Sequence, residues 1–284
     1  MGAARTAFGK NRTAWRELGK AAVLLLLLFC GLRPVFADGN EVDPDRLHVR
    51  ANWWFSLPSG YFKSSGREGG DQIDLHRDLG FGSYSTFSGS VDWRFARKHH
   101  LLLLASPVNS SRRTTLTRQI DWQGDTYDAG VTVDTDVHSF LFAPGYEWDF
   151  LRRSQWALGL MAQLNILDTS ATITGTASVN GQSATRTSKG SLIAPIPAVG
   201  PRVKFFPIPD SRKFDVDAGL QGMYLFGYGD FWAGRAMADF AFARHWYASA
   251  GYQLGTRLSV HGGENQIGIR LTQKGPVAGV MASW

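Results

Sequence analysis

The side chains that could do hydrolytic or metal chemistry are few and scattered. His76 lies near Asp74 in one predicted loop, and His261 lies in another. His138 and Ser139 are adjacent, so on a strand they point to opposite faces and cannot form a nucleophile–base pair. A single Cys excludes a disulfide scaffold and any multi-cysteine metal centre. We therefore predict no catalytic residue, no metal and no cofactor.

Polar and apolar residues alternate in several segments of the chain. Residues 47–57, 83–96, 213–226 and 246–259 carry apolar residues at every second position and small or polar residues between them. A period of two predicts β-strands with one apolar face. About ten strands are predicted between turns: residues 47–57, 83–96, 100–118, 130–150, 155–178, 183–206, 213–226, 231–243, 246–259 and 265–284. Several reach or exceed the roughly 9–11 residues with which a tilted strand crosses a bilayer.

Two kinds of connection alternate between these strands. The first kind is short and basic with aromatic flanks, at residues 95–99, 150–156, 206–214 and 242–246. The second kind is rich in Gly, Asp and Asn, at residues 58–82, 121–130, 179–182, 227–230 and 261–265, and Asn180-Gly181 is a strong hairpin signal. This order predicts an up-and-down antiparallel sheet, with loops 58–82 and 118–130 as the expected carriers of binding specificity. The three histidines near the basic turns, which are expected to face lipid headgroups, are His99, His100 and His245.

Aromatic residues concentrate at the short-turn ends of the strands. They are Trp93, Phe95, Trp148, Phe150, Trp156, Phe205, Phe206, Phe214, Phe242 and Trp246. A soluble sandwich or lipocalin-like barrel would bury its apolar face and has no reason to place its rings beside basic turns. A membrane barrel turns that face to lipid and carries aromatic girdles at the membrane–water boundary. We therefore predict an all-β fold, a closed antiparallel transmembrane β-barrel of about ten strands (about 8 to 12), with these residues as its periplasmic girdle.

The polar strand faces would then line the interior. The charged residues expected there are His48, Arg50, Asp92, Arg94, Asp215, Asp217, Arg235, Asp239, Arg257 and Arg270. Arg and Asp in a narrow barrel are expected to pair, because an unpaired buried charge is costly. A barrel of about eight strands has room only for side chains, whereas roughly 16 to 18 strands form an aqueous channel. We expect a lumen largely filled by side chains, with a narrow porin-like channel for small solutes as the alternative.

Most of the net positive charge lies in the N-terminal segment. The formal net charge is +6, and residues 1–37 carry six Lys and Arg against one Glu, so the remainder is almost neutral and a nucleic-acid partner is not expected. The basic start, the apolar run at residues 21–29 and small residues before Asp38 are typical of a secretory signal peptide over residues 1–37, which leaves residues 38–284 as the mature domain. Cys30 raises a lipoprotein as an alternative, although Phe29 is bulky where a lipobox has a small residue. A start codon later than the first Met also fits the long basic segment.

The last residues resemble the terminal signal of bacterial outer-membrane β-barrel proteins. Trp284 is a terminal aromatic with Gly279 five residues before it, and Ala282 is smaller than is typical at its position. The alternation across residues 38–284 is similar to that superfamily as well. The resemblance implies a location in the Gram-negative outer membrane after signal-peptide cleavage, contact with outer-membrane lipids, and assembly by the outer-membrane barrel assembly machinery.

These features predict an integral outer-membrane protein of the cell envelope with a structural or surface-interaction role and an unknown surface ligand. Two alternatives stay open. One is the narrow channel. The other is an enzyme at the barrel rim that acts on lipid or peptide through His76 or His261.

Overall fold

The computed structural model describes residues 45–63, 71–179, 182–208, 211, 213–225, 229–260 and 267–284. The predicted signal peptide, the Asn180-Gly181 turn and His261 lie outside these residues. The described elements are β1 (Leu47–Lys63), β2 (Gln72–Asp74), β3 (Tyr84–Ala96), β4 (His99–Thr115), β5 (Ile120–Trp122), β6 (Asp125–Tyr127), β7 (Thr132–Arg152), β8 (Trp156–Val179), β9 (Gln182–Phe205), β10 (Phe214–Leu225), β11 (Gly229–Ala243), β12 (Trp246–Val260) and β13 (Gly268–Ser283). Within the described ranges, no helix is long and apolar enough to cross a membrane.

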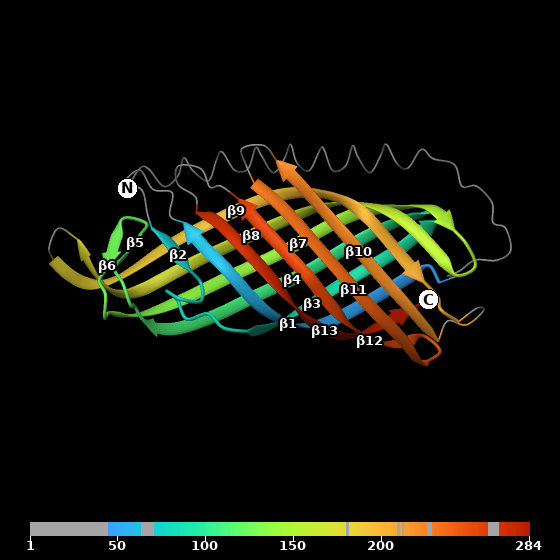
Figure 1. Ribbon diagram of the computed structural model, residues 1–284, viewed down its shortest axis with the longest axis horizontal. Coiled ribbons are helices and arrows are strands. Elements are labelled where there is room, and N and C mark those ends of the chain that lie inside the picture. Colours follow the sequence, from blue (N-terminus) through green and yellow to red (C-terminus); the bar gives the residue numbers. More distant parts are fainter. Residues whose placement is uncertain are drawn as a thin grey trace. The chain divides into compact units, whose positions relative to one another are not determined.

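Ten long strands pair into a closed antiparallel ring. Their order around the ring is β1, β3, β4, β7, β8, β9, β10, β11, β12 and β13, and Figure 1 shows them as one continuous twisted sheet. The ring closes where β1 pairs with β13, from His48–Ser283 to Lys63–Gly268. Over the closed part of the ring, backbone groups pair strand to strand, which is the condition for β-structure in lipid, and over residues 182–198 the described pairing of β9 is with β8 alone. The predicted fold class and number of long strands are confirmed.

The ring turns its large apolar side chains outward. Trp53, Phe87 and Phe140 are 51, 53 and 47 % exposed. On β7 the outward apolar positions extend from Phe140 to Phe150, about the 9–11 residues that a tilted strand needs to cross a bilayer, and the exposed residue before them is the polar His138. Strands β7, β8 and β9 have 21, 24 and 24 residues, so they continue past this apolar stretch at the loop end.

Three short strands fold against the inner face of the ring at its loop end. β2 pairs with β1, and the β5–β6 hairpin reaches β8 through Thr126 and Ser178 (Figure 1). Ile73, Ile120 and Trp122 are at most 1 % exposed and belong to one apolar cluster with inward-facing residues of the long strands. We call residues 71–82 and 116–131 the cap. Loops were predicted at residues 58–82 and 118–130, but the large side chains of the cap are buried because they cover the apolar inner wall.

Strands β9 and β10 approach so closely that one position tolerates only glycine. A Cβ atom at Gly200 would lie 1.8 Å from the carbonyl oxygen of Leu220 and 2.7 Å from the Cα atom of Gln221. The described pairing of these strands runs only from Phe205–Val216 to Val199–Gly222, so the contact is also short. The pairing of β9 with β10 therefore requires a residue without a Cβ atom at position 200.

We expect Gly200→Ala to lower the free energy of unfolding by about 1–3 kcal/mol, the usual cost of forcing extra atoms into a packed site. Urea unfolding of protein refolded in detergent micelles, followed by heat-modifiable migration in SDS gels, measures the change. Gly89→Ala is the matched control, because a Cβ atom at Gly89 would meet nothing within 4 Å. Equal midpoints for the two variants would contradict the role given to Gly200.

Candidate functional site

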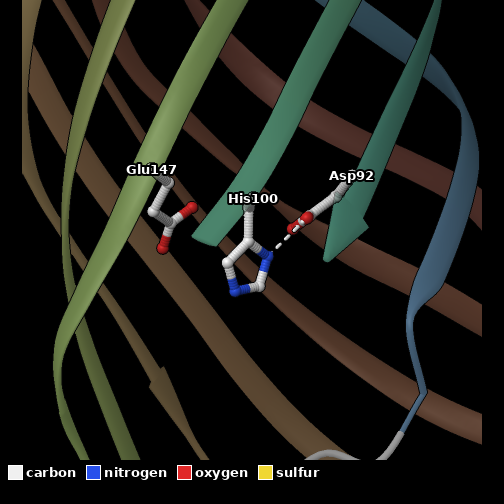
Figure 2. A group of neighbouring side chains, drawn as sticks. All are labelled: Asp92, His100 and Glu147. Carbon is white, nitrogen blue, oxygen red and sulfur yellow. Dashed lines mark hydrogen bonds and ion pairs between the residues drawn. The ribbon is translucent and has the colours of Figure 1, made fainter. Parts of the chain in front are cut away.

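A cluster of charged side chains fills the barrel interior near the short turns. The ring nitrogens of His100 lie 2.7 Å from Asp92 Oδ1 and 3.2 Å from Asp149 Oδ2. Figure 2 shows Glu147 on the other side of the imidazole, so that side chains from β3, β4 and β7 converge. Glu147 and Asp149 point inward because the intervening Trp148 points outward and is 45 % exposed.

Arg202 of β9 joins this cluster from across the lumen. Its Nη1 atom lies 2.8 Å from Asp92 Oδ2 and 2.6 Å from Glu147 Oε2. Its Nε and Nη2 atoms donate to the two carboxylate oxygens of Asp217 on β10, at 3.0 and 2.7 Å. Strands β8, β7 and β4 separate β9 from β3 around the ring, so this guanidinium crosses the interior instead of linking neighbours.

A second ion pair also crosses the interior. Arg50 Nη2 of β1 lies 2.6 Å from Asp239 Oδ2 of β11, and the Ser249 hydroxyl donates to the other oxygen of Asp239. Arg235 Nη2 lies 4.0 Å from Asp217 Oδ2, at the edge of an ion pair. We call this set the ion-pair layer: Arg50, Asp92, His100, Glu147, Asp149, Arg202, Asp217, Arg235 and Asp239.

The three side chains in Figure 2 also have the chemistry of a metal site. One ligand atom from each of Asp92, His100 and Glu147 lies within 4.8 Å of the others. Both carboxylates, however, already pair with the Arg202 guanidinium. A metal cation here would face that fixed positive charge, so the donor set fits a salt-bridge cluster better than a metal centre.

Eight of the charged residues predicted for the lumen lie inside the ring. Arg50, Arg94, Asp215, Asp217 and Asp239 are buried, whereas His48, Asp92 and Arg235 are partly buried. His48 lies where the chain ends meet, with its Nδ1 atom 3.1 Å from Ser283 Oγ, and Arg94 donates to the Asp45 carbonyl at 3.1 Å.

The prediction is wrong for two residues, which point outward. The Arg257 side chain is 54 % exposed and pairs with Asp230 at 3.0 Å, because a register shift in β12 between residues 253 and 256 reverses the alternation. Arg270 is exposed because its neighbour Ile269 faces inward, and its guanidinium carbon lies 5.7 Å from the Tyr61 ring centroid.

Seven of the ten residues predicted for the aromatic girdle are exposed. Trp93, Phe95, Trp148, Phe150, Trp156, Phe242 and Trp246 are 41 to 60 % exposed, and Phe205 and Phe214 are half-buried. Phe206 is 5 % exposed, which corrects its assignment to the exterior. Strand β9 ends at Phe205, and the Phe206 N–H turns to donate to the Gln155 carbonyl at 2.9 Å, which takes its ring out of the alternation.

Sequence reasoning missed four members of the ion-pair layer, namely His100, Glu147, Asp149 and Arg202. It placed His100 beside a basic turn that faces headgroups, but the side chain is 8 % exposed and lies in the lumen. The alternation of Glu147 and Asp149 with outward aromatics was a signal that could have placed both inside.

A cavity of about 290 Å³ lies between the ion-pair layer and the cap. On the loop side its wall is apolar and includes Phe62, Phe81, Phe231, Leu258, Ile269 and Leu271. On the turn side it is bounded by Arg50, Asp92, Arg202, Asp217 and Arg235. The interior therefore changes from apolar to charged along the barrel, with an open space at the transition.

The arrangement of the strands is that of a known class of proteins. No protein-family model and no curated protein matches the sequence. Among solved structures, the outer membrane protease OmpT from Escherichia coli superposes with a TM-score of 0.52 at 13 % identity, over 85 % of this chain and 97 % of that chain. This chain has the fold of a bacterial outer-membrane β-barrel protein.

Other solved barrels superpose with lower scores. The transport unit of the autotransporter AIDA-I from Escherichia coli gives a TM-score of 0.41 at 11 % identity, over 88 % of this chain and 93 % of that chain. Ail, the attachment invasion locus protein of Yersinia pestis, gives 0.33 at 12 % identity, over 83 % and 99 %.

Ion pairs also hold the cap of the barrel in place. Asp78 is 2 % exposed, and its carboxylate accepts hydrogen bonds from Arg118 Nη2 at 2.8 Å, Arg77 Nε at 3.0 Å and the Asp74 N–H at 2.9 Å. Burial raises the pKa of the Asp78 carboxyl, but the hydrogen bonds from Arg118 and Arg77 outweigh it and hold that pKa well below its usual range.

We expect Arg202→Met to lower the free energy of unfolding of the barrel by about 3–5 kcal/mol, because it removes the cation that three buried carboxylates share. Urea unfolding in micelles, followed by tryptophan fluorescence, measures the loss. Arg113→Met is the control, since Arg113 is 73 % exposed in its pair with Asp134 and its loss should cost less than about 1 kcal/mol. A similar small loss for both variants would show that the ion-pair layer adds little.

We expect the cap to loosen in acid. The folded-state pKa of Asp78 is lowered, so its stabilising effect is complete above the unfolded-state value of about 4 and is lost as the pH falls below it. Limited proteolysis with pepsin at pH 2 to 4 should cut within residues 71–82 more readily as the pH falls. Asp78→Asn should make the same segment cleavable by trypsin at pH 7, and Asp134→Asn, at an exposed pair, should not. Full protection of Asp78→Asn at neutral pH would contradict the role given to the Asp78 ion pairs in holding the cap.

Proposed function

We propose that the protein is an integral outer-membrane β-barrel that does not conduct, with a structural or surface-interaction role. The observation that carries this proposal is the Arg202 side chain, which joins β9 and β10 to β3 and β7 through the lumen. A bridge between strands that are not neighbours obstructs the passage that a channel needs.

The outer surface supports the membrane location. The exposed apolar stretch on β7 has the length of a bilayer crossing, and exposed aromatics flank the short turns. Export through a cleaved signal peptide over residues 1–37 remains part of the proposal. Lipids of the outer membrane are then the partners of this surface.

The contacts of β13 and Trp284 support the proposed assembly signal. Trp284 is 51 % exposed and stacks on His245 at 6.3 Å, whereas Ala282 is buried at 5 % exposure beside β12. The Trp284 N–H donates to the Leu47 carbonyl at 2.9 Å, so the terminal residue takes part in ring closure. We propose that Gly279, Ala282 and Trp284 form the signal read by the barrel assembly machinery.

The extended strands favour a surface role. Beyond the apolar stretch, β4 and β7 carry exposed polar pairs, among them Arg113–Asp134 at 2.7 Å and Ser111–Asp136 at 2.5 Å. In the proposed orientation this polar rim projects from the cell surface, where an interaction partner can reach it.

A narrow channel is the second candidate function, and the cavity of about 290 Å³ is the observation in its favour. The cap and the ion-pair layer bound this cavity at its two ends.

An enzyme at the rim is the third candidate, since one protein of similar fold is a protease by name. The likeness at 13 % identity concerns the fold and assigns no residue. The His76 Nδ1 atom lies 3.1 Å from the Phe81 carbonyl oxygen, and His138 Nδ1 lies 2.9 Å from Asn109 Oδ1. In both contacts the imidazole nitrogen lies beside an amide or backbone carbonyl oxygen, and neither contact supplies a nucleophile or a carboxylate. This favours the non-enzymatic role.

We expect the refolded protein to give no stable unitary conductance steps in planar bilayers at neutral pH, because Arg202 and its carboxylate partners bridge the lumen. Arg202→Gly, which opens the ion-pair layer, should raise the frequency of brief openings while the outer cap stays in place. A trimeric porin in the same bilayers is the positive control. Stable steps from the wild-type protein would replace the proposed function with the channel.

A further inference from the structure

We propose that the cavity in the barrel binds a single-chain amphiphile with an anionic head, of the size of a medium-chain carboxylate. This goes beyond the structural or surface role and does not depend on it. It rests on the closed barrel, on the cavity between the cap and the ion-pair layer, and on buried donors without a partner in residues that line this cavity.

The apolar end of the cavity sets the chemistry of the tail. Phe62, Phe231, Leu258 and Ile269 are each about 5 % exposed and line the wall beneath the cap. A volume of about 290 Å³ is at the lower limit of ligand pockets, which start at about 300 Å³. It accommodates about ten groups of the size of a water molecule or a methylene, at roughly 30 Å³ each. A straight chain of about ten carbons fits this space.

The charged end of the cavity has unused donors. Arg50 is 7 % exposed, and its Nη1 atom has no hydrogen-bond partner although Nη2 pairs with Asp239. The Arg235 side chain is 33 % exposed, and its ion pair with Asp217 spans 4.0 Å, which is too long for a hydrogen bond. Both arginines line the cavity, and the partly exposed Arg235 guanidinium can donate to an anion there.

The carboxylates at the same end are already occupied. Both oxygens of Asp217 accept from Arg202, and both oxygens of Asp239 accept from Arg50 and Ser249. The unused hydrogen-bonding capacity of this end therefore belongs to cations. An anionic head completes it, whereas a cationic head would face the two guanidinium groups.

The middle of the cavity offers one further donor. Trp54 lines the cavity, and its buried Nε1 atom has no hydrogen-bond partner. Buried polar atoms without partners are rare in folded proteins and commonly mark an absent ligand or water. An indole N–H only donates, so it suits the acceptor oxygens of an anionic head. Asn52 Oδ1 and Gln221 Oε1 also lack partners, but they are acceptors and need a donor such as water, which a carboxylate does not provide.

The test uses the full mature barrel in lipid nanodiscs and radiolabelled decanoate in equilibrium dialysis, with empty nanodiscs to subtract partition into lipid. We expect saturable binding of about one decanoate per barrel. Decanol, which has the same chain and no charge, should bind at least about tenfold more weakly, since a charge-assisted hydrogen bond is roughly twice as strong as a neutral one. Absence of saturable binding above empty nanodiscs overturns the proposal, as does equal binding of decanol.

Three variants locate the site. Arg235→Gln should weaken decanoate binding about tenfold and leave decanol unchanged. Arg113→Gln, at an exposed pair outside the cavity, should bind like the wild type. Ala233→Trp, which fills the apolar wall, should abolish saturable binding of decanoate, and heat-modifiable migration checks that it folds. Unchanged decanoate binding in Arg235→Gln overturns the assignment of the head. Conductance by the wild-type protein would contradict the proposed non-conducting role and would not change the decanoate result. The two proposals can therefore fail independently.

Discussion

Every backbone N–H and C=O group in a lipid-spanning sheet needs a partner within the protein, and the rest of this structure depends on that constraint. The pairing of β1 with β13 meets it by closing the ring of ten strands. Closure divides the strand positions into an outer and an inner set, since side chains alternate along each strand. The outer set is apolar, so the inner set has to hold the polar residues. The ion-pair layer and the cavity are consequences of this division.

The barrel interior is filled by ion pairs near the short turns and by apolar packing near the loops. Near the short turns, buried charges are stabilised only when they are paired, and Arg202 and Arg50 pair with carboxylates on strands that are not their neighbours. Near the loops, where β7 to β9 continue past the apolar outer stretch, the inner wall becomes apolar and the cap covers it. The cavity lies between the ion-pair layer and the cap, where neither group of side chains fills the lumen.

The long strands could be predicted closely because their signals are local. The strand predicted at residues 155–178 is β8, Trp156–Val179, and the one at 213–226 is β10, Phe214–Leu225. The interior was predicted less well. Arg257 was assigned to the wrong face because a bulge reverses the alternation without leaving a mark in the pattern. His100 was assigned to a headgroup-facing turn because the carboxylates beside it are distant in sequence or on another strand.

The sequence by itself determined the architecture of this protein: strand positions, the order of short turns and long loops, and the apolar exterior follow from period-two alternation and turn chemistry, which act over a few residues. Only the tertiary structure decided what the interior does. Asp92, Glu147, Arg202 and Asp217 meet because closure brings four strands around one lumen. The cap and the cavity likewise depend on contacts between residues far apart in the chain, such as Ile73, Trp122 and Ile267. Period and spacing carry no information about such distances, because ring closure alone sets them.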